Sequence, residues 1–341
     1  MVNHSVSTKT QEHHLINPSH EQSTSWHILG AGAMGCLWAA RIWQYAVTKQ
    51  NWSAQPVTLL LRDELALARW QHVGGVRVRS DDSTALTGVG ASTITNCLGP
   101  VDNLLICTKA QDAMNALNSV KHLLQANSRV FLIQNGIRAQ REIAEGFPTL
   151  ALYCLSTSHG AYLHDDFDVV HAGLGDTYLG SLNSARPLYG ERHAQILETL
   201  PSAAMNIVWD SNITGRLWTK FAVNCAINAF TVIYACRNGG LLRLPAATRE
   251  LRDLCAEIEK IMITVSDCPA PLVLFDKVDL VLRATAQNFS STLQDVRNGR
   301  RTEIAYFNGY LCELAQMANM ESPQNEAVLR RFNAIAKDTI D

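Results

Sequence analysis

The chain has 341 residues, of which 47% are hydrophobic and 18% are charged, and its formal net charge at pH 7 is −2. This length and apolar content predict a large core and about two domains. The near balance of acidic and basic residues excludes the basic surface of a nucleic-acid-binding protein. It also gives no reason to expect attraction to an anionic membrane. The sequence contains no apolar stretch of the roughly 20 residues that would span one.

Residues 1–24 are polar and rich in Ser, His, Gln and Asn, which predicts a disordered tail with solvated histidines. They lack the apolar run of a signal peptide. The chain has nine cysteines and no Cys-x-x-Cys pair, so we expect reduced core cysteines and no metal site. These features together predict a cytoplasmic protein.

Short apolar runs alternate with helical patterns up to about residue 208. The first β-like runs lie at residues 26–29, 57–61, 103–107 and 129–133, and helical patterns lie at residues 33–47 and 111–124. Apolar strands separated by helices predict a parallel sheet that is covered on both faces. Three later runs, at residues 150–154, 168–171 and 177–180, are expected to extend this sheet. A helix over residues 191–200 and a last short strand over 206–209 complete the pattern.

The pattern changes after residue 210. Nearly every segment of residues 213–336 has the periodicity of a helix, with breaks near residues 237–240, 268–271, 298–299 and 322–323. We therefore expect a tail over residues 1–24, an α/β domain over 25–210 and an all-α domain over 211–341.

A glycine-rich turn directly follows the first apolar run and opens a helical pattern. It consists of Gly30, Ala31, Gly32, Ala33, Met34 and Gly35. Gly30 permits a tight turn, Gly32 permits close approach of a pyrophosphate, and Gly35 permits close packing of helix and strand. The helix N-terminus supplies unpaired N–H groups to the phosphates. The turn predicts a nicotinamide dinucleotide site, and an ordinary βα turn is the alternative.

The end of the second strand predicts which dinucleotide binds. Arg62 comes first after the strand and Asp63 follows it. An Arg at this place accommodates the 2′-phosphate of NADP, whereas an acidic residue bonds the ribose hydroxyls of NAD. We therefore favour NADP and keep NAD as an alternative, together with a solvated surface role for Arg62.

Two further strands are followed by polar residues, Lys109 after residues 103–107 and Asn135 after residues 129–133. Ligands of open α/β sheets bind outside the carboxyl ends of the strands. Both side chains are therefore placed to reach the cofactor or the substrate. The alternative for each is an ordinary loop residue.

A polar stripe marks the apolar segment of residues 217–231. Lys220, Asn224 and Asn228 are spaced four apart and share one narrow face of a helix, with Thr231 on the same face. The other faces are apolar, so the helix is expected to be largely buried. Such a stripe suits a wet cleft that holds a polar ligand, with Lys220 as general acid toward a ketone. The alternatives are a solvent-exposed polar edge and amides paired with other helices.

A second polar segment covers residues 288–295 and is followed by a basic run over residues 297–301. Thr302 and Glu303 come next. From the sequence alone, capping of the following helix is the simplest role for this pair.

Taken together, these motifs resemble the ketopantoate reductase (2-dehydropantoate 2-reductase) family from about residue 26 to the C-terminus. The resemblance lies in the glycine turn, Thr108-Lys109-Ala110, Gln134-Asn135-Gly136, the lysine–asparagine helix and the segment of residues 290–297 with Thr302-Glu303-Ile304. It implies a Rossmann-type N-terminal domain with a mostly parallel sheet, an all-α C-terminal domain and an active site between them. It also implies NADPH-dependent reduction of 2-dehydropantoate to (R)-pantoate, a step toward pantothenate and coenzyme A.

The resemblance assigns roles to individual residues. It implies Lys220 and Glu303 as catalytic residues, with Glu303 close to the substrate hydroxyl and the cofactor. The implied substrate contacts are Lys220, Asn224, Asn228, Asn238 and, for the carboxylate, Ser291. The implied cofactor contacts, beyond the glycine turn, are Arg62, Lys109, Asn135, Ala161 and Glu303.

The chain departs from the family pattern at Ala229 and at residues 235–237, which precede Asn238. These departures affect Asn238 and the shape of the substrate pocket. Two other functions also stay open, reduction of another 2-keto acid and non-catalytic sensing of NADP. The expected partner is a small-molecule 2-keto acid, with neither nucleic acid nor membrane, for a chain that is a monomer or a homodimer.

Overall fold

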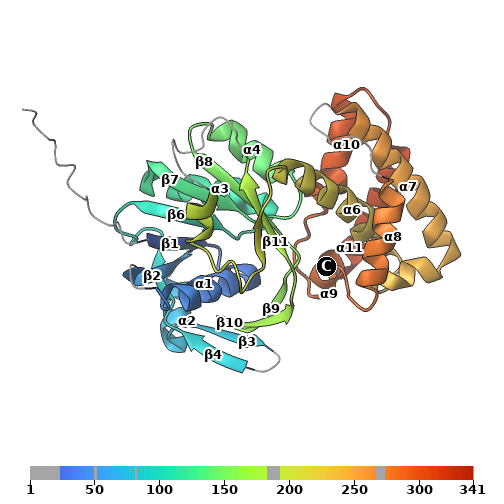
Figure 1. Ribbon diagram of the computed structural model, residues 1–341. Helices are drawn as coiled ribbons and strands as arrows, with labels where there is room; N and C mark the ends of the chain where they lie inside the picture. Colours follow the sequence, from blue (N-terminus) through green and yellow to red (C-terminus); the bar gives the residue numbers. More distant parts are fainter. Residues whose placement is uncertain (1–23, 50–51, 81–82, 183–192, 266–272, 341) are drawn as a thin grey trace, which may run out of the picture.

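The computed structural model describes residues 24–49, 52–80, 83–182, 193–265 and 273–340 (Figure 1). The predicted tail, apart from Thr24, lies outside the described residues. The break expected at residues 268–271 and the first two residues of the helix expected over 191–200 lie outside them as well. Strands and helices alternate up to Trp209, and helices alone follow from Ile213 within the described ranges.

An eight-stranded sheet forms the centre of the N-terminal half, in the order β12-β11-β8-β7-β6-β1-β2-β5. Its strands are β1 (Thr24–Leu29), β2 (Trp52–Leu61), β5 (Gly90–Thr93), β6 (Val101–Ile106), β7 (Leu124–Leu132), β8 (Ala151–Thr157), β11 (Thr177–Ser181) and β12 (Ile207–Trp209). Every neighbouring pair is parallel except β8 and β11. The expected mostly parallel sheet is confirmed. The chain reverses its direction across the sheet at β1 and β6, which is where such sheets bind dinucleotides.

The two faces of this sheet carry separate hydrophobic clusters, because side chains alternate along each strand. In β7, Val130 and Leu132 belong to a cluster with α3 (Ala110–Val120), α4 (Arg138–Gly146) and the C-terminal helices. Phe131 faces the other way, toward α1 (Ala33–Ala46). The sheet is therefore covered on both faces, as expected.

Two helices of this half end earlier than expected, and two others, α4 among them, were not expected. The helix expected over residues 111–124 ends at Val120, because residues 121–123 form a 3-10 turn and Leu124 begins β7. Helix α2 (Glu64–Val73) was missed, although Ala66, Leu67, Trp70 and Val73 form a partly buried apolar stripe against the cluster of α1. Short helix α5 (His193–Leu197) precedes β12.

A second sheet of four strands has the order β4-β3-β10-β9 and lies against α1. Its strands are β3 (Val76–Ser80), β4 (Ser83–Thr87), β9 (Gly160–Asp165) and β10 (Asp168–Gly173). The expectation that residues 168–171 extend the main sheet is wrong. Strand β8 already pairs with β7 on one edge and with β11 on the other. The β9–β10 hairpin, which follows β8 and precedes β11 along the chain, therefore pairs elsewhere. Strand β10 pairs with β3 instead.

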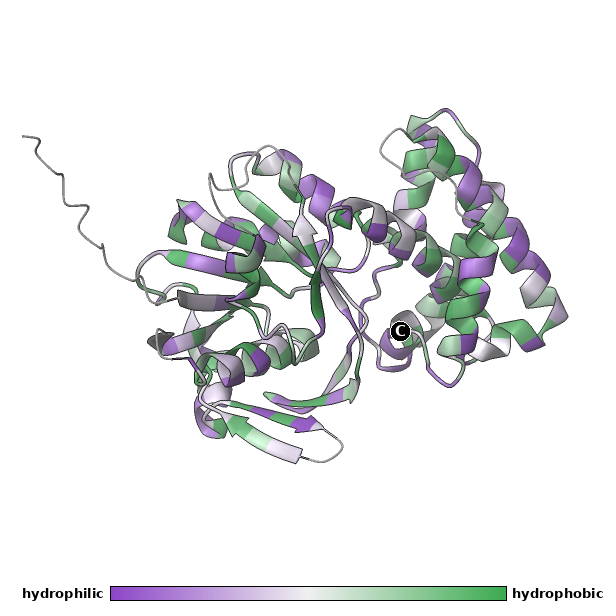
Figure 2. Cartoon of the chain, in the orientation of Figure 1, coloured by the Kyte–Doolittle hydropathy of each residue, from purple (hydrophilic) through white to green (hydrophobic). Residues whose placement is uncertain are grey.

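The C-terminal half consists of helices whose hydrophobic faces turn toward one another (Figure 2). They are α6 (Ile213–Ile233), η2 (Asn238–Arg243), α7 (Pro245–Thr264), α8 (Leu274–Ala284), α9 (Ser291–Arg297), η3 (Ile304–Tyr306), α10 (Asn308–Met317) and α11 (Pro323–Ile340). The breaks expected near residues 237–240, 298–299 and 322–323 are confirmed. None of the described helices is both long and apolar enough to cross a membrane.

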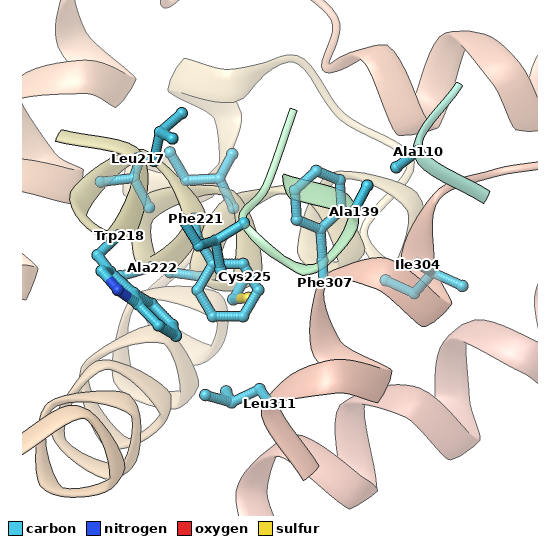
Figure 3. Packing of buried hydrophobic residues seen from close by; sticks show 14 of the residues in the cluster. Ala110, Ala139, Leu217, Trp218, Phe221, Ala222, Cys225, Ile304, Phe307 and Leu311 are labelled. Carbon is cyan, nitrogen blue, oxygen red and sulfur yellow. The ribbon is translucent and has the colours of Figure 1, made fainter. Parts of the chain in front are cut away.

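Helix α6 is the centre of this half and contacts α7, α8, α9 and α11. It also reaches the main sheet, where it contacts β8 and β11. Its Trp218 and Phe221 side chains pack among Phe307, Leu311 and Ala139 of α4 (Figure 3). The predicted burial of this helix is confirmed. Because α6 contacts both the C-terminal helices and the main sheet, its polar stripe lies at the boundary between the two halves.

Candidate active site

The glycine turn has the backbone that its sequence predicts. Gly30 has a φ of +106°, and a Cβ there would lie 2.8 Å from the Thr108 amide nitrogen. A Cβ on Gly35 would overlap the Gly30 carbonyl oxygen. In contrast, Gly32 is exposed, and no described atom lies within 4 Å of the place a Cβ would take. Gly30 and Gly35 therefore close the turn, whereas Gly32 leaves it open to a ligand.

The N-terminus of α1 adds an anion site to this turn. Gly32 is its N-cap residue, and no side chain of the described residues caps this end. Ala31, Ala33 and Met34 are partly exposed around it. The first-turn N–H groups and the helix dipole therefore face open space, which suits the pyrophosphate of a dinucleotide.

Two glycine variants are expected to separate cofactor binding from folding. Gly32→Ala is expected to fold normally and to weaken dinucleotide binding about tenfold or more, because its Cβ enters only the open ligand space. Gly35→Ala is expected to cost about 1–3 kcal/mol of stability, because its Cβ overlaps backbone. Fluorescence titration and urea unfolding measure the two effects. Equal stability losses in both variants would contradict this division of roles.

Arg62 and Asp63 follow β2, and their side chains differ in exposure and in hydrogen bonding. Asp63 Oδ1 accepts a hydrogen bond from the Ala66 backbone at 2.8 Å and caps α2. This backbone hydrogen bond and the Arg62 guanidinium, 2.9 Å away, hold the pKa of Asp63 below its usual range. The Arg62 side chain is 87% exposed. Asp63 is thus used by its own helix, whereas the Arg62 cation projects outward beside the carboxyl end of β2.

Asp63→Ala is expected to lower the melting temperature by roughly 1–3 °C, because an N-cap is lost. Asp63→Asn keeps a capping oxygen and is expected to melt like the wild type. Neither change is expected to weaken NADH binding in a fluorescence titration. A large loss of NADH affinity in Asp63→Asn would instead support the alternative in which Asp63 bonds a ribose.

Two side chains join the N-terminal half to the C-terminal half at the start of α3. Lys109 Nζ donates to Asp295 Oδ2 at 2.8 Å and to the Arg301 carbonyl oxygen at 2.5 Å. Glu303 Oε1 accepts from the Ala110 backbone N–H at 2.9 Å. The simple expectation that Glu303 caps its own following helix is wrong, because it makes no side-chain cap at η3. It caps α3 of the other half, where the helix dipole favours a carboxylate.

Lys220 lies at the same boundary, on α6. Its Nζ donates to the Thr157 carbonyl oxygen, 2.7 Å away, at the end of β8. Burial lowers the pKa of Lys220 to about 8, and the charge of Glu303 acts in the opposite direction. Burial also raises the pKa of Glu303, against the hydrogen bond from Ala110. A lysine with a pKa this close to neutrality is suited to give up a proton.

The C-terminal end of the polar stripe, at Thr231, faces the start of α9. Thr231 Oγ1 lies 2.6 Å from Ser290 Oγ, which caps α9 by accepting from Leu293 N. Asn228 is 5% exposed and Asn224 is partly buried. Ser291, the first residue of α9, is exposed. Ser290 is thus the structural serine of this pair, and Ser291 is left accessible to a ligand.

Asn238 is buried at the start of η2, with 7% of its surface exposed. Its Nδ2 donates to Thr285 Oγ1 at 2.8 Å. Its Oδ1 has no hydrogen-bond partner among the described residues. A buried, unpaired amide oxygen has a free-energy cost, which a donor from a water molecule or a ligand would offset.

Two sequence stretches match family models. Residues 26–184 match "Ketopantoate reductase PanE/ApbA", and residues 212–336 match "Ketopantoate reductase PanE/ApbA C terminal". The chain belongs to the ketopantoate reductase family. It is therefore an oxidoreductase, and the resemblance seen in its motifs is confirmed.

Curated relatives of the family align along almost their whole length. The 2-dehydropantoate 2-reductase of Vibrio cholerae is 30% identical over 310 residues, which cover 90% of this chain and 96% of the relative. That of Yersinia pestis is 29% identical over 302 residues, covering 87% and 90%.

Solved structures show the same fold at lower identity. A PanE/ApbA family ketopantoate reductase from Ralstonia eutropha has a TM-score of 0.80 at 21% identity, covering 93% of this chain and all of the other. D-mandelate dehydrogenase with NADH and anilino(oxo)acetate has a TM-score of 0.79 at 19% identity, covering 93% and 99%. The Rossmann-type half followed by a helical half is thus the fold of this ketopantoate reductase family member.

Within this ketopantoate reductase family member, the predicted residues fall into groups. Lys109, Lys220 and Glu303 meet at the boundary between the halves, whereas Arg62 lies apart at the end of β2. Asn135 follows β7 and is partly exposed. Ala161 lies in β9, paired with His171.

The sequence analysis assigned no role to two residues that organise this reductase site. Thr157 was missed because its strand was expected to end at residue 154, three residues early. Gln134, next to Asn135, donates from Nε2 to the carbonyl oxygens of Ile106 and Thr108. It therefore fixes the turn that leads to Lys109. Both Thr157 and Gln134 are polar residues at the end of a buried strand, and that position is the sequence feature that could have identified them.

Proposed function

We propose that this chain reduces 2-dehydropantoate to (R)-pantoate with NADPH, as a step toward pantothenate and coenzyme A. The observation that carries the proposal is Lys220, held by the Thr157 carbonyl beside Glu303 and with its pKa lowered to about 8 by burial. Membership of the ketopantoate reductase family supports the reaction.

Most of the cofactor contacts would come from the N-terminal half, and Glu303 would add one from the C-terminal half. The glycine turn and the start of α1 would hold the pyrophosphate, and the exposed Arg62 would pair with the 2′-phosphate. Lys109, Asn135, Ala161 and Glu303 would complete the contacts, with the Lys109 ammonium shared with Asp295. When bound, NADPH supplies a hydride to the C2 ketone of the substrate.

Lys220 would act on the ketone oxygen. Its ammonium polarises the carbonyl first and then donates a proton to the oxygen as the alkoxide develops. The Thr157 carbonyl keeps the ammonium in one orientation, and burial keeps its pKa low enough for transfer. Glu303, fixed by the Ala110 N–H, would accept from the substrate hydroxyl.

The remaining substrate contacts would come from the C-terminal half. Ser291 would hold the carboxylate at the start of α9, with Asn224 and Asn228 along the stripe. The unpaired Oδ1 of Asn238 would accept from a substrate hydroxyl. In this scheme residues 25–210 form the cofactor domain and residues 211–341 the substrate domain.

The test is 2-dehydropantoate-dependent oxidation of NADPH, followed by absorbance, in a panel of 2-keto acids that includes phenylglyoxylate. We expect 2-dehydropantoate to have the highest kcat/KM of the panel. Preference for another keto acid would replace the substrate in the proposal. Tight NADPH binding without turnover of any keto acid would instead favour a sensor.

A further inference from the structure

Two buried histidines, one of them two residues from Thr157, take no part in the mechanism above. His159 follows β8, two residues after Thr157, and His171 lies in β10. They are 7% and 5% exposed. His159 Nδ1 lies 2.9 Å from His171 Nε2. Buried imidazoles in direct contact need a defined donor and acceptor at every ring nitrogen.

The neighbours of the pair determine these roles. Arg41 Nη2 lies 3.1 Å from His171 Nδ1, and a guanidinium only donates, so Nδ1 accepts. His171 therefore carries its proton on Nε2 and donates to His159 Nδ1. His159 Nδ1 also accepts from the Gly175 N–H, and its Nε2 donates to the Met205 carbonyl oxygen at 3.1 Å. The result is a directed chain from Arg41 through both histidines to Met205.

This chain connects the cofactor helix with the carbonyl that receives Lys220. Arg41 lies on α1, directly downstream of the glycine turn. Beside the imidazole chain, the His159 backbone N–H donates to Thr157 Oγ1 at 3.2 Å, and Thr157 Oγ1 also contacts Thr177 Oγ1 at 3.0 Å. The peptide whose carbonyl holds the Lys220 ammonium is fixed at its Ser158 N–H, which donates to the Asp176 carbonyl oxygen at 2.9 Å. His159 Nδ1 holds the neighbouring Gly175 N–H at 3.2 Å, so the imidazole supports the segment that fixes this peptide.

We propose that His159 and His171 are positioning residues for the reaction, which hold the Thr157 carbonyl where it receives the Lys220 ammonium and tie that carbonyl to α1. Their kinetic effect rests on the proposed function. Their effect on the titration of Lys220 does not, because it is a property of the protein without cofactor or substrate.

Different charged groups lie around His171 and around Lys220, so the two side chains have different pKa values. Burial, followed by the charges of Arg41 and His159, lowers the pKa of His171 to about 4, so its Nδ1 is free to accept from Arg41 at neutral pH. The charged group that faces Lys220 is Glu303, which is itself faced by Lys109 and Asp295. A pH effect near 8 that disappears in Lys220→Ala therefore reports on Lys220.

The first test replaces His159 with Phe, which keeps a ring and removes both nitrogens. We expect kcat to fall about 10- to 100-fold, as for a displaced catalytic group, with the Kd for NADPH within about 3-fold of wild type. The fall of kcat/KM at alkaline pH (the alkaline limb) is expected to move to lower pH, because the Lys220 ammonium is easier to deprotonate without its carbonyl acceptor. The control is His164→Phe, an exposed position in β9 of the same hairpin.

A second pair of variants covers the case in which His159→Phe does not fold. His171→Gln keeps an N–H for His159 and is expected to keep the alkaline limb near its wild-type position. His171→Phe removes that donor and is expected to shift the limb. Wild-type kcat and an unmoved limb in folded His159→Phe, or an identical limb in both His171 variants, would overturn the proposal.

A titration of Lys220 distinguishes failure of this inference from failure of the proposed function. If the wild type turns over no keto acid, the proposed reaction is wrong. The pKa of Lys220 is then measured in the cofactor-free protein by NMR of isotopically labelled lysine side chains, assigned with Lys220→Ala. A lower pKa in the His159 or His171 Phe variant supports the positioning role, and an unchanged pKa overturns it.

Discussion

Lys220→Ala is expected to lower kcat by about 10²–10⁴-fold, the usual contribution of a general acid, with a much smaller change in the Kd for NADPH. The reason is that the ammonium lies at the boundary of the two halves and has a pKa of about 8. In the wild type, kcat/KM is expected to fall as the pH rises through about 8, because only the protonated lysine donates. Steady-state kinetics over a pH series measure both effects.

The control for this variant is Lys121→Ala, which removes an exposed lysine after α3. It is expected to behave as the wild type at every pH. The alkaline limb is expected to be absent from Lys220→Ala, since the group that causes it has been removed. A wild-type rate in Lys220→Ala, or the same limb in the variant, would remove Lys220 from the mechanism.

Arg62→Ala is expected to weaken NADPH binding by about 10- to 100-fold, the value of a charge-assisted hydrogen bond, and to change NADH binding by less than about 3-fold. Only NADPH carries the 2′-phosphate that the exposed Arg62 would meet. Asp63, which would bond a ribose in an NAD enzyme, is already used to cap α2. Fluorescence titration with each cofactor gives the two dissociation constants.

Arg69→Ala is the matched control for Arg62→Ala, because Arg69 lies on the following helix and its side chain is about half exposed. Loss of this cation is expected to leave the NADPH to NADH ratio unchanged. Equal losses for both cofactors in Arg62→Ala would contradict the role of Arg62 in 2′-phosphate binding.

The parts of the site that follow from local patterns were predictable from the sequence. The glycine turn has φ +106° at Gly30 and an open Gly32, as its motif requires. The spacing of Lys220, Asn224 and Asn228 predicted one face of a buried helix, and α6 has that burial. These features depend on residues close together in the chain, where helix period and turn geometry determine the structure.

The features that depend on distant partners were not predictable. Glu303 looks like a helix cap in the sequence, and it is one, but for α3, which is 193 residues away from it. Strand β10 has an ordinary β pattern, and only the full pairing of β8 shows that it belongs to another sheet. His159 and His171 give no periodic signal, because their roles depend on Arg41 and Met205.

The bonds that join the two halves also bear on the order of folding. Lys220 and Thr157 are 63 residues apart, and Lys109 and Asp295 are 186 residues apart. Closing loops of this length costs chain entropy before any packing compensates for it, so such contacts form late. Neither half alone contains the lysine, its carbonyl acceptor and the capped helix together. During refolding, helical structure should therefore return first, and the proton donor should reach its working position only when the halves dock.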